Sequence, residues 1–260
     1  MFARNSSLIF LAVLTVFMSD LSVHAGVYSG VINSDLVMAA VKGDTSKVQF
    51  LLDQGADVDA QNKYGSTALI EAAGKGHLEL ISLLLEYGAD INATSRYGTS
   101  ALMMAAEKSN LPLVEFLLEN GANVNTKSQD GETALMKASA NGDMEIFQLL
   151  LDAGAYVNVK DNHEGYTALL LACENNNVDI VKILIKNGAD VNSRNVWGTT
   201  PLIWATNRGD TQIVKMLLKR GADVNVKIAD EDGVITALSR AERRGYWEIV
   251  DILKKAGAKE

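Results

Sequence analysis

Apolar and polar residues follow each other along this chain with the spacing of short amphipathic helices, and the pattern returns about every 33 residues. In each returning unit a Thr or Ser precedes a small residue and Leu, an apolar stretch follows, and the unit ends in Gly-Ala. The stretch from Ile180 to Ile185 is too apolar to face water alone. Each unit therefore predicts two short helices that must pack against the neighbouring units.

Two independent sequence markers keep this period. The first marker is Gly-Ala followed by Asp, Asn or Tyr, and it begins at Gly55, Gly88, Gly121, Gly154, Gly188 and Gly221. The second marker is Thr or Ser, then Ala or Pro, then Leu, and it begins at Thr67, Ser100, Thr133, Thr167, Thr200 and Thr236. Their steps are 33 to 36 residues long. Such a period indicates an array of repeats, and the array determines the fold.

The residue types of each unit explain its helix ends. A Thr or Ser such as Thr67 can cap a helix with its hydroxyl. The first helix then ends at a glycine such as Gly76, Gly142 or Gly209. The second helix ends at the Gly of Gly-Ala, a position that favours left-handed dihedral angles. Turn residues follow, as in the segment 62–65, so a hairpin connects one unit to the next.

Segments 65–92 and 198–225 resemble the ankyrin repeat, whose consensus includes T-P-L-H-x-A-A, G-H-x-E-I-V-x-x-L-L and G-A-D-V-N. The resemblance covers about residues 30–260 and implies an all-α solenoid of stacked helix-turn-helix units with hairpin loops. The predicted repeats, numbered one to seven, are 30–61, 62–94, 95–127, 128–160, 161–194, 195–227 and 228–260. Repeat five carries one extra residue around 161–165, so we expect a local change in its hairpin.

The first 25 residues have the features of a secretory signal peptide. Arg4 precedes the apolar run 8–18, and Val23 and Ala25 are the small residues required before a cut at Gly26. Residues 26–29 form a short leader to the repeats. We expect a periplasmic or secreted protein. The alternative is a scaffold tethered by an uncleaved signal, but eleven residues at about 1.5 Å per residue do not cross roughly 30 Å of hydrocarbon.

Composition excludes several other classes of protein. The net charge of −8 argues against binding to nucleic acid or to anionic lipid, so we expect no nucleic-acid partner and no membrane contact after signal cleavage. A single cysteine excludes a disulfide framework and a Cys-rich zinc site. We expect no cofactor and no metal ion, and a monomer.

No constellation of residues indicates catalysis. Cys173 occupies a small-residue position inside a helix, where a thiol packs as an apolar group. His163 stands beside Glu164 on an exposed hairpin tip. An enzyme or redox protein that uses Cys173 or His163 remains the alternative hypothesis.

In ankyrin-repeat proteins, ligands usually dock on the concave face made of the hairpin tips and the exposed side of the first helices. Mapping by spacing predicts the following partner-binding residues: Tyr64, Arg96, Tyr97, Met104, Tyr166, Leu171, Trp197, Trp204 and Arg208. Exposed Tyr, Trp and Met with nearby Arg have the composition of a binding hot spot. Alternatively, Tyr64 and Tyr97 stack along the tips for stability. We expect Trp247 to pack in the core or against the last repeat.

Overall fold

The computed structural model of the 260-residue chain describes residues 29–230 and 233–259. The predicted signal peptide and residues 26–28 of the leader lie outside the described residues. The chain divides after Ala93 into two compact units. Each unit is treated separately below.

The first unit contains two helix pairs. Residues 29–42 are helical and precede α2 (Thr45–Asp53), α3 (Ala68–Lys75) and α4 (Leu78–Glu86). Helix α4 packs against both α2 and α3.

The second unit repeats the same pair and adds a small β-hairpin. Its first helices are α5 (Ala101–Glu107), α7 (Ala134–Asn141), α9 (Ala168–Glu174), α11 (Pro201–Arg208) and α13 (Ala237–Arg244). Its second helices are α6 (Leu111–Glu119), α8 (Met144–Asp152), α10 (Val178–Lys186), α12 (Thr211–Lys219) and α14 (Trp247–Lys255). Strands β1 (Ile228–Asp230) and β2 (Gly233–Ile235) pair antiparallel.

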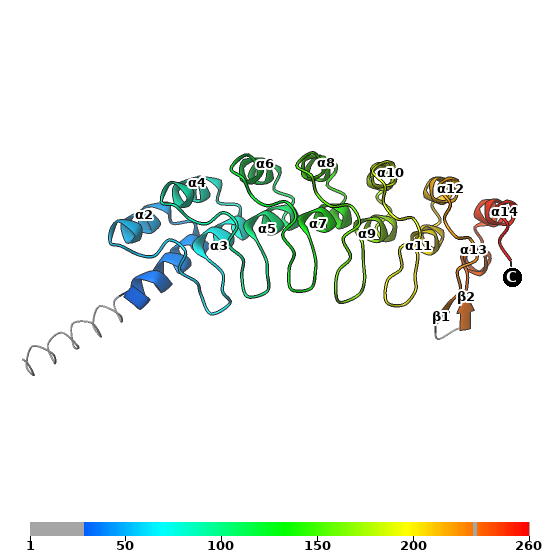
Figure 1. The fold of residues 1–260 in the computed structure, drawn as a ribbon, viewed down its shortest axis with the longest axis horizontal. Coiled ribbons are helices and arrows are strands. Elements are labelled where there is room, and N and C mark those ends of the chain that lie inside the picture. The colour runs from blue at the N-terminus through cyan, green and yellow to red at the C-terminus, as the bar shows by residue number, and fades with distance from the viewer. Residues whose placement is uncertain (1–28, 231–232, 260) are drawn as a thin grey trace, which may run out of the picture. The chain divides into compact units, whose positions relative to one another are not determined.

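Within the second unit the helices form two rows. Each first helix packs against the next first helix, from α5 through α13, and each second helix packs against the next one. Figure 1 shows the hairpin loops projecting from the row of first helices, away from the row of second helices. Leucines such as Leu113, Leu117 and Leu150 are fully buried between the rows. The all-α ankyrin solenoid predicted from the sequence is confirmed.

The predicted helix ends are also confirmed. The Thr67 hydroxyl accepts a hydrogen bond from the Ile70 amide at 3.4 Å, and the equivalent bonds exist in the other repeats with a Thr or Ser cap. Gly76, Gly142 and Gly209 end their helices in the left-handed conformation. Side-chain oxygens at these caps satisfy amides that the helix itself leaves without an acceptor.

An asparagine in the Gly-Ala motif connects each repeat of the second unit to the next. Asn158 Oδ1 accepts from the Asp190 amide at 2.9 Å, and Asn158 Nδ2 donates to the Gly188 carbonyl at 3.0 Å. Asn192 makes the same two bonds one repeat further along. The recurring Asn therefore fixes the spacing of the loops. In the described part of the chain, no helix has the length and apolar character needed to span a bilayer.

Candidate partner-binding surface

The candidate surface consists of the hairpin tips and the outward side of the first helices. Within the second unit, main-chain hydrogen bonds join successive tips. The Gln129 amide donates to the Tyr97 carbonyl at 2.8 Å, and the Val196 amide donates to the Glu164 carbonyl at 2.8 Å. Between them, the Asn162 amide donates to the Asp130 carbonyl. The tips are thus held as one row at fixed spacing.

Aromatic side chains on these tips are strongly exposed. The exposed fractions are 61% for Tyr97, 55% for Trp197 and 50% for Tyr64. Lys63 Nζ lies 4.8 Å from the centre of the Tyr64 ring, so this ring in the first unit already has a cation over it. Large exposed rings on a rigid backbone lose little conformational entropy on binding, which favours their use in recognition.

The other predicted residues of the surface differ in exposure. Arg96 and Arg208 are exposed, and the Arg208 guanidinium Nε donates to the Glu174 carbonyl. Met104, Leu171 and Trp204 are half-buried on the outward side of α5, α9 and α11.

Tyr166 differs from the other predicted residues of the surface, because its ring is buried. It is only 7% exposed. The Trp197 ring covers it edge-on, with ring centres 6.4 Å apart and planes at 70°. Burial, together with the neighbouring Glu174 carboxylate, raises the pKa of Tyr166 to about 12. Tyr166 therefore supports Trp197 from beneath.

The expected packing of Trp247 is wrong, because this side chain is 67% exposed. Trp247 is the first residue of α14, a second helix, so it lies outside the candidate surface. Residues at the equivalent position of earlier repeats, such as Met144 and Val178, are only half-buried themselves. The first residue of these second helices is therefore not a core position.

The two candidate reactive groups, Cys173 and His163, differ in their exposure to solvent. Cys173 is fully buried in α9, as predicted, and burial raises the pKa of its thiol, so the reactive thiolate is disfavoured. His163 is exposed at a tip, as expected, and its Nδ1 lies 4.0 Å from Glu164 Oε1. In the described residues, no group of His, Cys, Asp and Glu is arranged to hold a metal ion.

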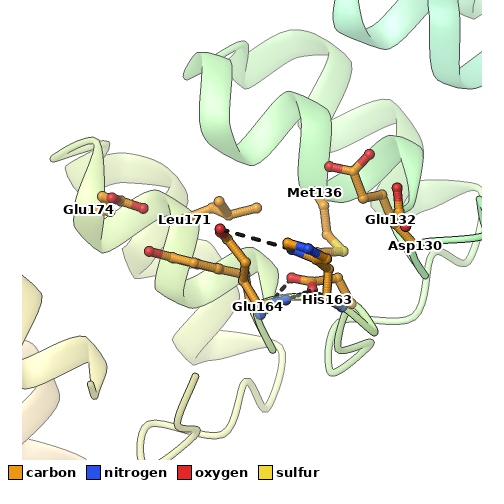
Figure 2. A pocket seen from close by; sticks show the side chains of 9 residues that line it. Asp130, Glu132, Met136, His163, Glu164, Leu171 and Glu174 are labelled. Atoms are coloured by element: carbon orange, nitrogen blue, oxygen red, sulfur yellow. Dashed lines mark hydrogen bonds and ion pairs between the residues drawn. The ribbon is translucent and has the colours of Figure 1, made fainter. Parts of the chain in front are cut away.

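A hollow of about 290 Å³ opens on the surface between repeats four and five. The residues that line it, referred to below as the acidic hollow, are Asp130, Glu132, Met136, Asp161, His163, Glu164, Tyr166, Leu171 and Glu174. Figure 2 shows Asp130 and Glu132 to one side of His163 and Glu174 to the other, with Met136 and Leu171 between them. Carboxylates thus surround a floor that contains apolar side chains.

Sequence reasoning missed the acidic hollow, although one signal pointed to its place. The extra residue of repeat five lies in the segment 161–165, and the Asp161 carboxylate organises the enlarged turn. Its Oδ1 accepts from the amides of His163, Glu164 and Gly165, and its Oδ2 accepts from the Tyr166 amide at 2.6 Å. This turn places Glu164 at the edge of the hollow.

Comparison with known families agrees with the geometry. A family model described as ankyrin repeats (3 copies) matches residues 36–128, 110–195 and 190–260. A comparison with curated proteins found no match. The matched segments span both units described above, and ankyrin repeats indicate a protein–protein interaction module that is in general non-catalytic. The chain belongs to the ankyrin-repeat family.

Proposed function

We propose that this protein binds a partner protein outside the cytoplasm, and that the hairpin tips and the outward side of the first helices are the contact surface. The observation that carries the proposal is the pair of exposed rings, Tyr97 and Trp197, on tips that are joined by main-chain hydrogen bonds. An exposed Trp contributes little to stability in water, whereas buried by a partner it is a frequent hot-spot residue.

Trp204 lies on the helix next to these tips and supports the same proposal. Together with Met104 and Leu171 it places large apolar side chains at one repeated position of the first helices. At this position Lys137 of repeat four separates Met104 from Leu171. Half-buried apolar side chains interspersed with and bordered by cations such as Lys137 and Arg208 resemble the centre and rim of a protein interface.

The export part of the proposal rests on the signal-peptide pattern of residues 1–25. Its test is the N-terminal residue of protein recovered from an export-competent host, measured by intact mass. A chain that begins at Gly26 supports export, whereas a chain that keeps Met1 and sediments with membranes contradicts it.

Affinity capture tests the binding surface. The full-length gene is expressed in the native compartment with a C-terminal tag, and captured proteins are compared between the wild type and the variants Tyr97→Ala, Trp197→Ala and Trp204→Glu. We expect each variant to reduce capture of the same protein at least tenfold, as expected for hot-spot residues worth about 1.4 kcal/mol or more.

The matched control is Trp247→Ala, which removes another strongly exposed Trp from a second helix, away from the surface. Circular dichroism and the urea midpoint check that all variants remain folded. Equal loss of capture in Trp247→Ala and Trp197→Ala would contradict the proposed surface. Unchanged capture in all three surface variants would do the same.

A further inference from the structure

We infer that the acidic hollow receives a positively charged side chain, Arg or Lys, of the partner protein. The inference rests on the proposed function, because it assigns a chemistry to the partner that this surface would bind. It depends on three features of the hollow: its size, its apolar floor and the carboxylates at its edge.

Size and floor fit a long side chain with a charged end. The volume of about 290 Å³ exceeds that of a single water molecule several times over. Met136 of α7 and Leu171 of α9 contribute apolar atoms to the lining, and so does the ring of Tyr166. The aliphatic stem of Arg or Lys packs well on such atoms while its charged end reaches outward.

Short contacts within the protein already hold the carboxylates of Glu132 and Asp161. Glu132 Oε2 lies 2.6 Å from Lys137 Nζ, which also lies 3.8 Å from Glu107 Oε2. The Asp161 carboxylate accepts hydrogen bonds from the backbone amides of its own turn. These two groups shape the hollow but are not needed for a ligand.

Asp130, Glu164 and Glu174 are the carboxylates that carry the charge complementarity, and the Glu174 carboxylate also accepts a hydrogen bond from the Tyr166 hydroxyl. They come from the tip of repeat four, the tip of repeat five and the end of α9, so they approach the hollow from different directions. Three cations lie nearby. Lys137 pairs with Glu132 and Glu107, the Arg208 Nε donates to the Glu174 carbonyl, and the Lys160 Nζ, beside Gly165, donates to the Arg194 carbonyl. Each of them already has a partner, and none of them belongs to the lining. The lining therefore carries a net negative charge, and a cation entering it gains Coulomb energy that an anion or a neutral group does not.

The geometry favours a side chain over a bare metal ion. No group of ligating side chains in the described residues converges closely enough to hold a metal. Carboxylates spread around an apolar floor instead suit the several N–H donors of a guanidinium or ammonium group.

The test uses capped pentapeptides as probes, added to the full-length processed protein and followed by amide chemical shifts in NMR spectra. The peptides have the sequence Gly-Ser-X-Ser-Gly with X as Arg, Lys or the neutral isostere citrulline. We expect the Arg and Lys peptides to shift the amides of Glu164, Gly165 and Tyr166 in a saturable way. Their apparent affinity should exceed that of the citrulline peptide at least tenfold.

Two triple variants separate the hollow from the overall charge. The first variant combines Asp130→Asn, Glu164→Gln and Glu174→Gln and so removes the charge of three carboxylates of the hollow. We expect it to lower the affinity for the Arg and Lys peptides at least tenfold. Asp179→Asn with Glu115→Gln and Glu119→Gln removes the same residue types from exposed positions on the second helices. This control should keep the wild-type affinity.

Three outcomes overturn the inference: equal binding of the citrulline peptide, equal weakening by both triple variants, or saturable shifts confined to residues outside the hollow. Partner capture distinguishes this failure from failure of the proposed function. If the hollow variant captures the partner as well as the wild type does while Trp197→Ala does not, the inference fails and the proposed surface stands. If none of the surface variants affects capture, the proposed function fails.

Discussion

Replacing Gly98 by Ala tests how tightly one hairpin tip is placed against the next. Gly98 has a φ of +72°, and a Cβ atom built on it lies 2.9 Å from the Gln129 amide nitrogen, 2.9 Å from Ser128 Cα and 3.0 Å from the Lys127 carbonyl oxygen. These are backbone atoms, so the neighbouring tip must move as a whole. The movement also threatens the 2.8 Å hydrogen bond from the Gln129 amide to the Tyr97 carbonyl.

Gly121→Ala is the matched control, because it carries the same backbone strain without the contact. Gly121 has a φ of +88°, and a Cβ atom there has no neighbour within 4 Å. A left-handed Ala costs about 1–2 kcal/mol, and the smaller entropy of its unfolded chain returns about half of that. Gly98→Ala adds about 1 kcal/mol for the lost hydrogen bond and more for the displaced backbone. We expect Gly121→Ala to cost about 1 kcal/mol and Gly98→Ala about 2–4 kcal/mol.

Urea unfolding followed by circular dichroism gives the two free energies, and hydrogen exchange gives a local reading. The Gln129 amide should exchange faster in Gly98→Ala than in the wild type, whereas its exchange rate should be unchanged in Gly121→Ala. If both variants have the same midpoint and the same exchange rate at Gln129, the tips do not approach each other as closely as described.

Three further predictions follow from single groups. Since burial raises the pKa of the Cys173 thiol, Ellman's reagent should label the native protein far more slowly than the urea-unfolded chain, and equal rates would contradict this burial. Because the pKa of Tyr166 is raised from 10.0 to about 12, the unfolded chain loses this proton first, and the free energy of unfolding should fall as the pH rises between those values. Tyr166→Phe should reduce this fall and remove the tyrosinate absorbance that appears near pH 12. An unchanged absorbance titration would refute the assignment. Asn158→Ala should lower the free energy of unfolding by about 2 kcal/mol, since two hydrogen bonds between repeats are lost, whereas Asn120→Ala, which loses one bond to Phe116 within its own helix segment, should cost less.

The fold could be predicted from the sequence because each repeat carries its own local signals. A hydroxyl at Thr67 and a glycine at Gly76 mark the two ends of α3 without reference to the rest of the chain. Stacking then follows from the apolar faces of the helices, which a single repeat cannot bury. The repeat markers give no signal for the strand pairing between Ile228 and Ile235, because that pairing needs partners on both sides of a turn.

The site could be predicted only where exposure depends on one repeat alone. Tyr97 and Trp197 stand at the tips, and a tip is exposed whatever its neighbours are. The burial of Tyr166 depends instead on Trp197, which belongs to the next repeat. Trp247 is exposed for a different reason, because its position on the second helices is only half-buried in earlier repeats as well. Exposure of a side chain such as Tyr166 is a property of adjacent pairs of repeats, which spacing alone does not reveal.

Trp204 shows what the surface costs in stability. In the first unit, Asn62 Nδ2 donates to Glu71 Oε1 at 2.9 Å across the base of the hairpin. In repeat six the corresponding residues are Asn195 and Trp204, and among the described residues the buried Trp204 Nε1 has no hydrogen-bond acceptor. A buried donor without an acceptor costs about 1–3 kcal/mol, so a glutamate at this position would serve the fold better than the tryptophan does. The indole is difficult to explain as a stabilising residue, and its place beside the exposed tips is what a residue kept for recognition requires.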